Sequence, residues 1–168
     1  MLISFRKLNR GTDIIEQEDR VELKGAEREH PDLVHLEPVK VRVQAWKDGE
    51  TYHVHGRQST EAEFRCSRCL TTFSRPLSME WHRILTDAEP KEDEEDAVQV
   101  DPDQPVDVTP FIREALLLEF PLAPVCREDC KGLCPACGVN RNEQTCQCDT
   151  RPVDPRLAKL QELLDREE

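Results

Sequence analysis

Hydrophobic and polar residues alternate along several stretches in the first half of the chain. Three valines and an alanine alternate with polar residues over 39–45, and the same alternation recurs over 62–66 and 77–81. A period of two is typical of β-strands that bury one face and expose the other. The pattern therefore predicts a strand in each of these stretches.

A turn signal follows the first of these strands. The dipeptide Asp48-Gly49 is favoured in two-residue hairpin loops, and Tyr52 and Val54 begin the return strand. Apolar residues nearer the N-terminus predict one or two further strands. We therefore expect an antiparallel, meander-like sheet over residues 1–86.

One buried helix is predicted in the second half of the chain. Thr109 can cap its N-terminus, and Pro110 suits the first helical position, because the missing N–H costs no hydrogen bond there. Pro121 ends the helix, since proline disfavours helical geometry in the residue before it. Apolar residues cover most of the circumference, so we expect this helix to pack against the sheet. They are Phe111, Ile112, Ala115, Leu116, Leu117 and Leu118.

The C-terminal part of the chain has a different composition. Residues 126–148 contain six cysteines and little hydrophobic material, so this segment needs a metal to fold. Asp154-Pro155 then opens a short terminal helix with leucines on one side. The predicted fold class is α+β: an antiparallel β region with a CxxC hairpin over 1–86, an acidic loop over 87–106, and a packed helix, a zinc-ribbon-like cysteine-rich segment and a terminal helix over 107–168.

The net charge of −12 is concentrated in one segment. From Asp87 to Asp107 there are ten acidic residues and one lysine, so the rest of the chain carries only −3. Phosphate repels carboxylate, but a nucleic-acid contact outside this segment remains open. The acidic and proline-containing stretch 86–105 is typical of a mobile loop or linker. An alternative is that it attracts a basic partner, such as a ribosomal protein.

The cellular compartment determines how the cysteines are interpreted. No apolar run reaches the roughly 18 residues that a membrane span needs, and the first residues lack the apolar region of a signal peptide. We therefore expect a cytoplasmic protein with no membrane partner. Thiols stay reduced there, so clustered cysteines are more often metal ligands or catalytic groups than disulfides.

The eight cysteines form four pairs along the chain. Two residues between cysteines let both sulfurs point at one ion, and a following glycine such as Gly138 can adopt the left-handed conformation that aims N–H groups at the thiolates. Eight sulfurs are the number that two tetrahedral four-cysteine sites need. The pairs are Cys66 and Cys69, Cys126 and Cys130, Cys134 and Cys137, and Cys146 and Cys148.

Loop length favours one assignment of these pairs. The last two pairs would form a compact local ribbon, and the first two would form a long-range site that fixes the tail to the sheet. A single site within 126–148 that leaves Cys66 and Cys69 partly free is the alternative. Zn²⁺, as one or two ions, suits thiolate ligands in tetrahedral sites, although iron fits the same ligands. Four protein sulfurs leave no position for water, so such sites are structural and not catalytic.

Other interpretations of the cysteines predict different chemistry. Buried apolar thiols, a disulfide framework and a thioredoxin-like redox pair at Cys66 and Cys69 are each possible, but the redox pair favours a strand-to-helix setting that this stretch lacks. A cytosolic thiol-redox or metal-sensing zinc protein is therefore the rival class. The sequence contains no pattern typical of an enzyme. His53 and His55 are expected to be solvent-facing strand residues rather than metal ligands or RNA-stacking groups.

Basic residues flank the cysteines and would converge if the long-range site forms. They would then either offer a positive patch to RNA phosphate or offset the charge of the thiolates, which is about −2 for each four-cysteine zinc site. The sequence favours neither role over the other. These residues are Arg65, Arg68, Arg75, Arg127, Lys131 and Arg141.

An ordered set of motifs extends beyond the cysteine pairs. It comprises Cys66-Ser67-Arg68-Cys69-Leu70, three leucines at 116–118, Pro121, Pro124, Cys126, Cys130-Lys131-Gly132-Leu133-Cys134, Cys137-Gly138, Asn140, Cys146-x-Cys148 and Asp154-Pro155-Arg156. This set resembles the YceD family, described as large-subunit (23S) ribosomal RNA accumulation proteins. The resemblance is strongest over 64–73 and 107–160.

The resemblance implies a cytosolic bacterial protein without enzymatic activity or a small-molecule substrate. It implies a part in making or maintaining the large ribosomal subunit, with ribosomal RNA or a basic ribosomal protein as the partner. The residues themselves indicate metal binding and structural sites, and they carry no independent signal for ribosomes.

Overall fold

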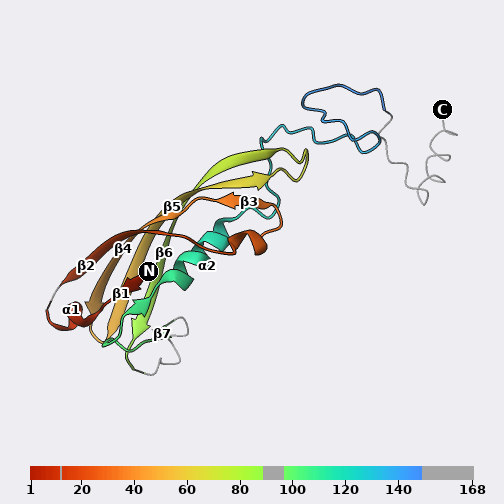
Figure 1. Ribbon diagram of the computed structural model, residues 1–168. Helices are drawn as coiled ribbons and strands as arrows, with labels where there is room; N and C mark the ends of the chain where they lie inside the picture. Colours follow the sequence, from red (N-terminus) through yellow and green to blue (C-terminus); the bar gives the residue numbers. More distant parts are fainter. Residues whose placement is uncertain (12, 89–96, 149–168) are drawn as a thin grey trace, which may run out of the picture.

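The computed structural model describes residues 1–11, 13–88 and 97–148, and its main body is a six-stranded sheet (Figure 1). The strands run in the order β2-β4-β5-β6-β7, and β3 pairs with the far part of β5. All pairings are antiparallel except that of β6 with β7. The strands are β2 Ile14–Val21, β3 Leu33–Leu36, β4 Val39–Asp48, β5 Thr51–Arg65, β6 Thr72–Thr86 and β7 Val98–Gln99.

Two smaller strands and three short helical elements complete the described fold. The strands β1 and β8 pair with each other and bring the N-terminus next to the start of α2. No helix among the described residues is long and apolar enough to cross a membrane. The elements are β1 Leu2–Ile3, α1 Arg6–Asn9, a 3₁₀ helix over Ala26–Arg28, β8 Val106–Asp107 and α2 Thr109–Glu119.

The central hairpins have the geometry that the alternation predicts. In β4, the residues Val39, Val41, Val43 and Ala45 are buried and those between them are exposed or half-buried. Residues 52–54 and 62–66, which the pattern separates, belong mainly to one 15-residue strand, β5. It pairs with β6 along its whole length. The antiparallel meander over β4, β5 and β6 is confirmed.

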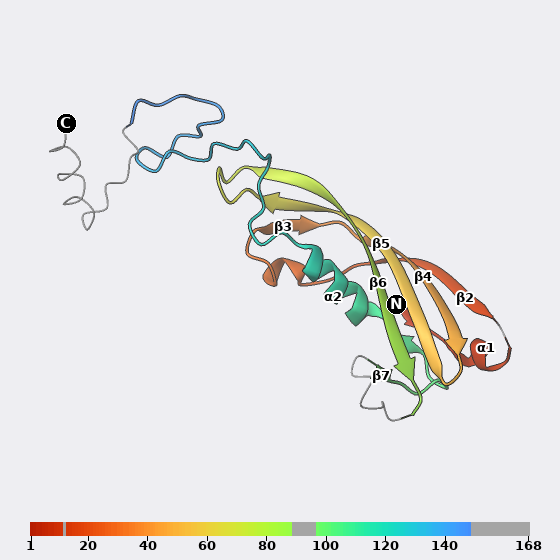
Figure 2. The ribbon, with the colours of Figure 1, turned by 180° about the vertical axis from the view of Figure 1, so that it is seen from behind.

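The helix α2 covers one face of the sheet (Figure 2). Ile112 and Leu116 are fully buried against the core, but Leu118 is 79% exposed. The expected packing of the helix against the sheet is confirmed, but only one stripe of its apolar residues is buried. Phe120 follows the helix with extended geometry, as expected before Pro121.

The start of α2 also differs from its prediction. The N-cap residue is Val108, and Thr109 is the first helical residue. The hydroxyl group of Thr109 donates to Oδ1 of Asp107, with the two oxygens 2.6 Å apart, rather than capping the helix. Pro110 therefore occupies the second helical position, where its missing N–H is equally harmless.

A buried polar contact fixes α2 on the sheet. The Gln58 side chain is only 3% exposed, and its Nε2 donates to the carbonyl oxygen of Ile112 at 2.9 Å. Nε1 of Trp81 in turn donates to Oε1 of Gln58, also at 2.9 Å. The ring of Trp81 lies over Gly56, where an added Cβ would be 2.1 Å from Cε2 of the ring. Gly56 therefore makes room for the tryptophan that holds this contact.

Part of the acidic segment is bound to the sheet. The expected loop over 87–106 contains β7, which runs parallel to the end of β6, and Val100 N–H donates to the carbonyl oxygen of Thr86 at 2.8 Å. The expectation of a free loop is wrong for this portion, since Val98 and Gln99 pair with the end of β6 and Val100 packs against the core. Residues 89–96 and the terminal helix expected after Asp154 lie outside the described residues.

Candidate metal centres

The structure brings the eight cysteines together in two groups of four. Site 1 contains Cys66, Cys69, Cys126 and Cys130, and site 2 contains Cys134, Cys137, Cys146 and Cys148. Within each group, all sulfur atoms lie within 4.8 Å of one another. This grouping is the one that loop length favours. It differs from the alternative, in which a single site lies within residues 126–148 and Cys66 and Cys69 are partly free.

The sulfur spacing in site 1 fits a tetrahedral metal ion. Sγ of Cys66 lies 3.8 Å from Sγ of Cys130, and Sγ of Cys69 lies 3.7 Å from Sγ of Cys126. A zinc ion with Zn–S bonds of about 2.3 Å at the centre of a tetrahedron would place its sulfur ligands about 3.8 Å apart. Four thiolates without a carboxylate or water position form a donor set that suits a structural ion such as Zn²⁺.

The hairpin between β5 and β6 positions the first half of site 1. Cys66 N–H donates to the carbonyl oxygen of Thr71 at 3.0 Å, and Leu70 N–H donates to that of Cys66 at 2.9 Å. This tight turn requires a left-handed residue after Cys69, and Leu70 occupies that position with φ of 59°. Both sulfurs therefore emerge on the same side of the hairpin tip.

The tail reaches site 1 by a short path from the end of α2. Ser67 N–H donates to the carbonyl oxygen of Pro124 at 2.8 Å, which holds the tail against the hairpin tip. Cys126 N–H then donates to Sγ of Cys66 at 3.4 Å. Nη1 of Arg68 donates to the carbonyl oxygen of Cys130 at 3.1 Å. Figure 1 shows this segment leaving the sheet at the tip of the β5–β6 hairpin.

Site 2 repeats the same turn in a more exposed setting. Gly138 follows Cys137 with φ of 75°, and its N–H donates to the carbonyl oxygen of Cys134 at 2.8 Å. The left-handed glycine is confirmed, although its own N–H faces a carbonyl group and not a thiolate. Cys134 is buried, but Cys137 and Cys148 are exposed. The cysteines of site 2 are therefore more exposed to solvent than those of site 1.

The pKa values of the thiols in site 1 are shifted in opposite directions by different causes. Burial raises the pKa of Cys66, but hydrogen bonds from the N–H groups of Cys126, Cys69 and Arg68 outweigh it and lower the pKa to about 6. Burial and the neighbouring thiols raise the pKa of Cys126 to about 12. One thiolate therefore opposes the ionisation of its neighbours, and a bound cation would remove this repulsion.

Site 2 has the same division between thiols. N–H groups of Cys137 and Ala136 lower the pKa of Cys134 to about 6. Hydrogen bonds among the thiols, first with Cys137 and then with Cys134, raise the pKa of Cys148 to about 12. Each site thus contains at least one stabilised thiolate, with Cys130 a second one in site 1, and a bound cation would favour deprotonation of the remaining thiols.

Two of the basic residues around the cysteines make contacts within the cysteine segment. Arg68 donates to the carbonyl oxygens of Glu128 and Cys130, and Arg127 pairs with Asp129 while donating to Asn142. These two arginines therefore help to hold the cysteine segment together. The alternatives that the sequence left open, an RNA contact and neutralisation of the thiolate charge, both remain predictions.

At the end of the sheet away from the cysteine sites, three rings lie together in an arrangement that the sequence did not indicate. His53, expected to face solvent, is half-buried beside the rings of Trp46 and His82. The hairpin loop is Gly49-Glu50, with Asp48 paired to Thr51, and this register places Trp46 opposite His53. The predicted loop Asp48-Gly49 would have placed Trp46 opposite Thr51, so the sequence did not identify this neighbour. The contact with His82 could not be predicted either, because it depends on the register across the cysteine turn.

Comparisons with known proteins place the chain among bacterial and plant relatives. An uncharacterized protein from Mycobacterium tuberculosis is 34% identical over 137 residues, which cover 76% of this chain and 61% of the relative. Protein YlbN from Bacillus subtilis, also uncharacterized, is 28% identical over 154 residues, covering 91% of this chain and 90% of YlbN. The chain thus spans about three-fifths of the length of the mycobacterial relatives.

A plant protein links these sequences to a named role. The large ribosomal RNA subunit accumulation protein YCED homolog 1, chloroplastic, from Zea mays is 42% identical over 52 residues, covering 30% of this chain and 18% of the maize protein. No solved structure matches the chain. The family model described as large ribosomal RNA subunit accumulation protein YceD matches residues 54–164, which include both cysteine groups. The chain therefore belongs to the YceD family.

Proposed function

We propose that this chain is a non-enzymatic, zinc-stabilised protein of the cytoplasm that supports accumulation of 23S ribosomal RNA by binding ribosomal RNA or a ribosomal protein. The observation that carries the proposal is that the eight cysteines, all within the residues matched by the family model, come together as two groups of four sulfurs. Membership of the family supports the ribosomal role, and the complete sulfur ligand sets support a structural metal.

Zinc would act by holding the tail in shape. Between Pro121 and Cys148 the buried residues are two cysteines, one proline and one glycine, so the segment has almost no hydrophobic core of its own. They are Pro124, Cys130, Gly132 and Cys134. Zinc binding in small modules of this kind is worth on the order of 10 kcal/mol of folding free energy. Site 1 would also attach this segment to the sheet, because two of its ligands come from each.

The test is rescue of ribosomal RNA levels in cells that lack the protein. We expect a lower ratio of 23S to 16S ribosomal RNA without it, and recovery with the native chain. The variant Cys66→Ser/Cys69→Ser should lose one zinc ion per chain and fail to rescue. Ser67→Ala, at the same turn, keeps all sulfurs and should rescue. A normal ratio in cells without the protein would contradict the proposal.

The exposed thiols of site 2 favour a second candidate, a thiol-redox or metal-sensing protein. Cys137 and Cys148 are open to reagents in solution. A sensor of this kind predicts that these thiols react with iodoacetamide within minutes in the untreated protein. The structural proposal predicts slow reaction until a chelator removes the metal, because the thiolates are then coordinated.

A further inference from the structure

The face of the sheet that points away from α2 carries a regular pattern of polar and aromatic side chains. In β4, Val41 and Val43 face the core, so Arg42 and Trp46 point to the other side. In β5, Gln58 faces α2, so Arg57 also lies on the outer side. We call this surface, formed by β2, β4, β5 and β6, the outer face.

Three rings lie close together at one end of the outer face. The ring centroid of His53 is 5.3 Å from that of Trp46 and 5.2 Å from that of His82, and the planes differ by 9° and 12°. Nδ1 of His53 is 3.1 Å from Nε2 of His82, within hydrogen-bond distance. His82 is exposed and the other two rings are half-buried. We call these nearly parallel rings the ring cluster.

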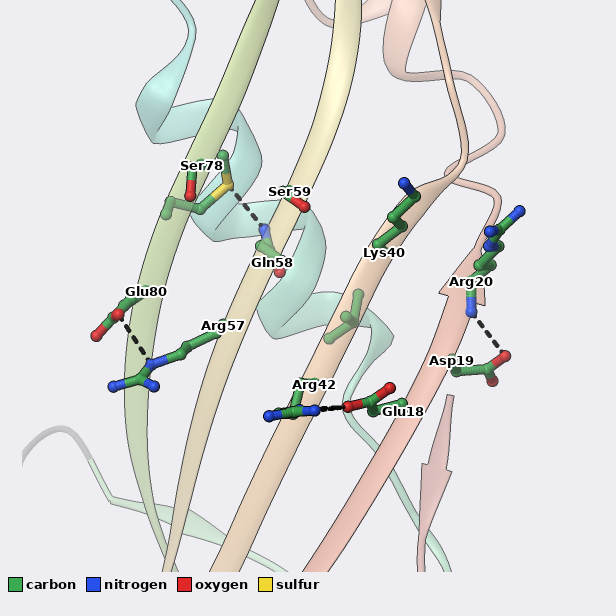
Figure 3. Close-up of a pocket in the computed structure, with 12 residues that line it drawn as sticks. Glu18, Asp19, Arg20, Lys40, Arg42, Arg57, Gln58, Ser59, Ser78 and Glu80 are labelled. Carbon is green, nitrogen blue, oxygen red and sulfur yellow. Dashed lines mark hydrogen bonds and ion pairs between the residues drawn. The ribbon is translucent and has the colours of Figure 1, made fainter.

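A groove lined by charged residues lies on the same outer face (Figure 3), and on β4 its Arg42 is separated from Trp46 of the ring cluster by Gln44. Arg42 lies opposite Arg57, and Lys40 lies opposite Ser59. Two residues along a strand span about 6.6 Å, so Lys40 and Trp46 on β4 are about 20 Å apart. The cluster and the groove therefore form one strip long enough for several nucleotides.

The groove is basic relative to the chain as a whole. Four basic and three acidic residues line it, whereas the whole chain has 23 basic and 35 acidic residues. Glu80 bonds Arg57 at 2.9 Å and Glu18 pairs with Arg42, which orients both guanidinium groups. Lys40 has no ion pair within the part of the chain that the structure describes. An anionic partner would therefore meet cations that are already in position.

Flat rings beside ordered cations favour single-stranded RNA over other anionic partners. Unpaired bases stack on aromatic and histidine rings, and arginine and lysine bind the phosphates between them. In a duplex, stacking of successive base pairs hides the base faces, so a duplex could use only the cations. Burial and the charges of His53, His55 and Arg83 lower the pKa of His82, which leaves an uncharged ring at neutral pH.

We propose that the outer face binds single-stranded RNA, with bases stacked on the ring cluster and phosphates bound by Lys40, Arg42 and Arg57. This inference rests on the proposed function, because it selects RNA from the two partner classes named there. It assigns the contact to the end of the sheet away from both cysteine groups. The metal sites would then shape the tail without touching this RNA.

The test uses the full, zinc-loaded chain and a fluorescein-labelled 12-nucleotide single-stranded RNA in fluorescence anisotropy. The double variant His53→Ala/His82→Ala should raise Kd by at least about five-fold, since each lost base stack has an effect of this size or larger. The control His35→Ala removes an exposed histidine of β3, outside the ring cluster, and should leave Kd unchanged. An equal Kd for the parent and the double variant would overturn the proposal.

A second pair of variants tests the cations. Lys40→Gln/Arg57→Gln should lower the slope of log K against log salt by about 0.7 for each phosphate contact removed. Arg28→Gln, an exposed arginine of the 3₁₀ helix next to α2, should not change the slope. Equal slopes for all three proteins would place the phosphates elsewhere and contradict the assignment.

Tryptophan fluorescence separates stacking from a change in structure. Trp46 lies in the ring cluster and Trp81 is buried, so RNA that stacks at the cluster should quench Trp46 only. Trp46→Phe should keep RNA binding by anisotropy and lose the quenching. Quenching that persists in Trp46→Phe would overturn the proposed position.

Failure of this inference can be told apart from failure of the proposed function. If cluster variants bind RNA normally while cells without the protein lose 23S ribosomal RNA, the outer-face assignment is wrong and the ribosomal role stands. If the outer face binds RNA as expected while those cells keep normal 23S levels, the ribosomal role is wrong. If the parent binds only a ribosomal protein and no RNA, the inference is overturned.

Discussion

The backbone N–H of Leu133 donates to the carbonyl oxygen of Arg68, with nitrogen and oxygen 2.9 Å apart. This bond joins the hairpin turn of site 1 to the segment that enters site 2, across 65 positions of sequence. Gly132 approaches the same carbonyl oxygen so closely that an added Cβ would lie 2.9 Å from it. Backbone contacts therefore join the two candidate metal sites, in addition to the covalent chain between Cys130 and Cys134.

Replacing Gly132 should weaken this junction. Gly132 has φ of 70°, which alanine adopts at a cost of about 1 kcal/mol, and its Cβ would also collide with the carbonyl oxygen of Arg68. We expect Gly132→Ala to lower the free energy of unfolding by about 2 kcal/mol in urea titrations. Gly138→Ala is the matched control, because it has φ of 75° and open space around the new Cβ. Equal losses for both variants would show that the contact with Arg68 contributes nothing.

Leu70 should prove to be a strained residue. It holds φ of 59° in the turn where site 2 has glycine, and its side chain is 58% exposed, so little apolar burial compensates. Leu70→Gly is therefore expected to raise the free energy of unfolding of the zinc-loaded protein by up to about 1 kcal/mol. A clear loss of stability would mean that the leucine side chain makes a stabilising contact.

Gly56 should not tolerate a larger residue. The new Cβ of Gly56→Ala would lie 2.1 Å from the Trp81 ring, and moving this ring would break its hydrogen bond with Gln58. The expected loss is about 1–3 kcal/mol or more in the free energy of unfolding. Ser59→Ala changes an exposed residue of the same strand and should have an effect below about 0.5 kcal/mol. Similar values for both variants would contradict the packing described here.

The two metal sites should lose their ions at different rates. Site 1 has three buried sulfur ligands, whereas site 2 has one. A chelator in excess should therefore remove zinc in two phases, and the fast phase should belong to site 2. Cys137→Ser should abolish the fast phase and leave the slow one. Release in a single phase, or a fast phase that survives in Cys137→Ser, would contradict this difference.

Local features of the sequence were sufficient for the central hairpin and for the grouping of the cysteines. Alternation along β4 and the Asp48-Gly49 turn signal predict one hairpin without reference to the rest of the chain, although its loop lies one residue later. Short loops make the two cysteine groups the simplest pairing. The exposure of Leu118 could not be predicted, because periodicity does not say how much of a helix the sheet covers. The ring cluster could not be predicted either, since the register between β5 and β6, which brings His82 near His53, depends on the turn that links Cys66 to Thr71.

The most direct test of the ribosomal role is sedimentation of the tagged protein from native lysate in a sucrose gradient. The proposal predicts that the protein migrates with large-subunit particles or their precursors in moderate salt. It also predicts that Cys66→Ser/Cys69→Ser moves the protein to the top of the gradient, because the tail is no longer held against the sheet. A native protein found only at the top, with neither ribosomal RNA nor a ribosomal protein bound to it, would contradict the account.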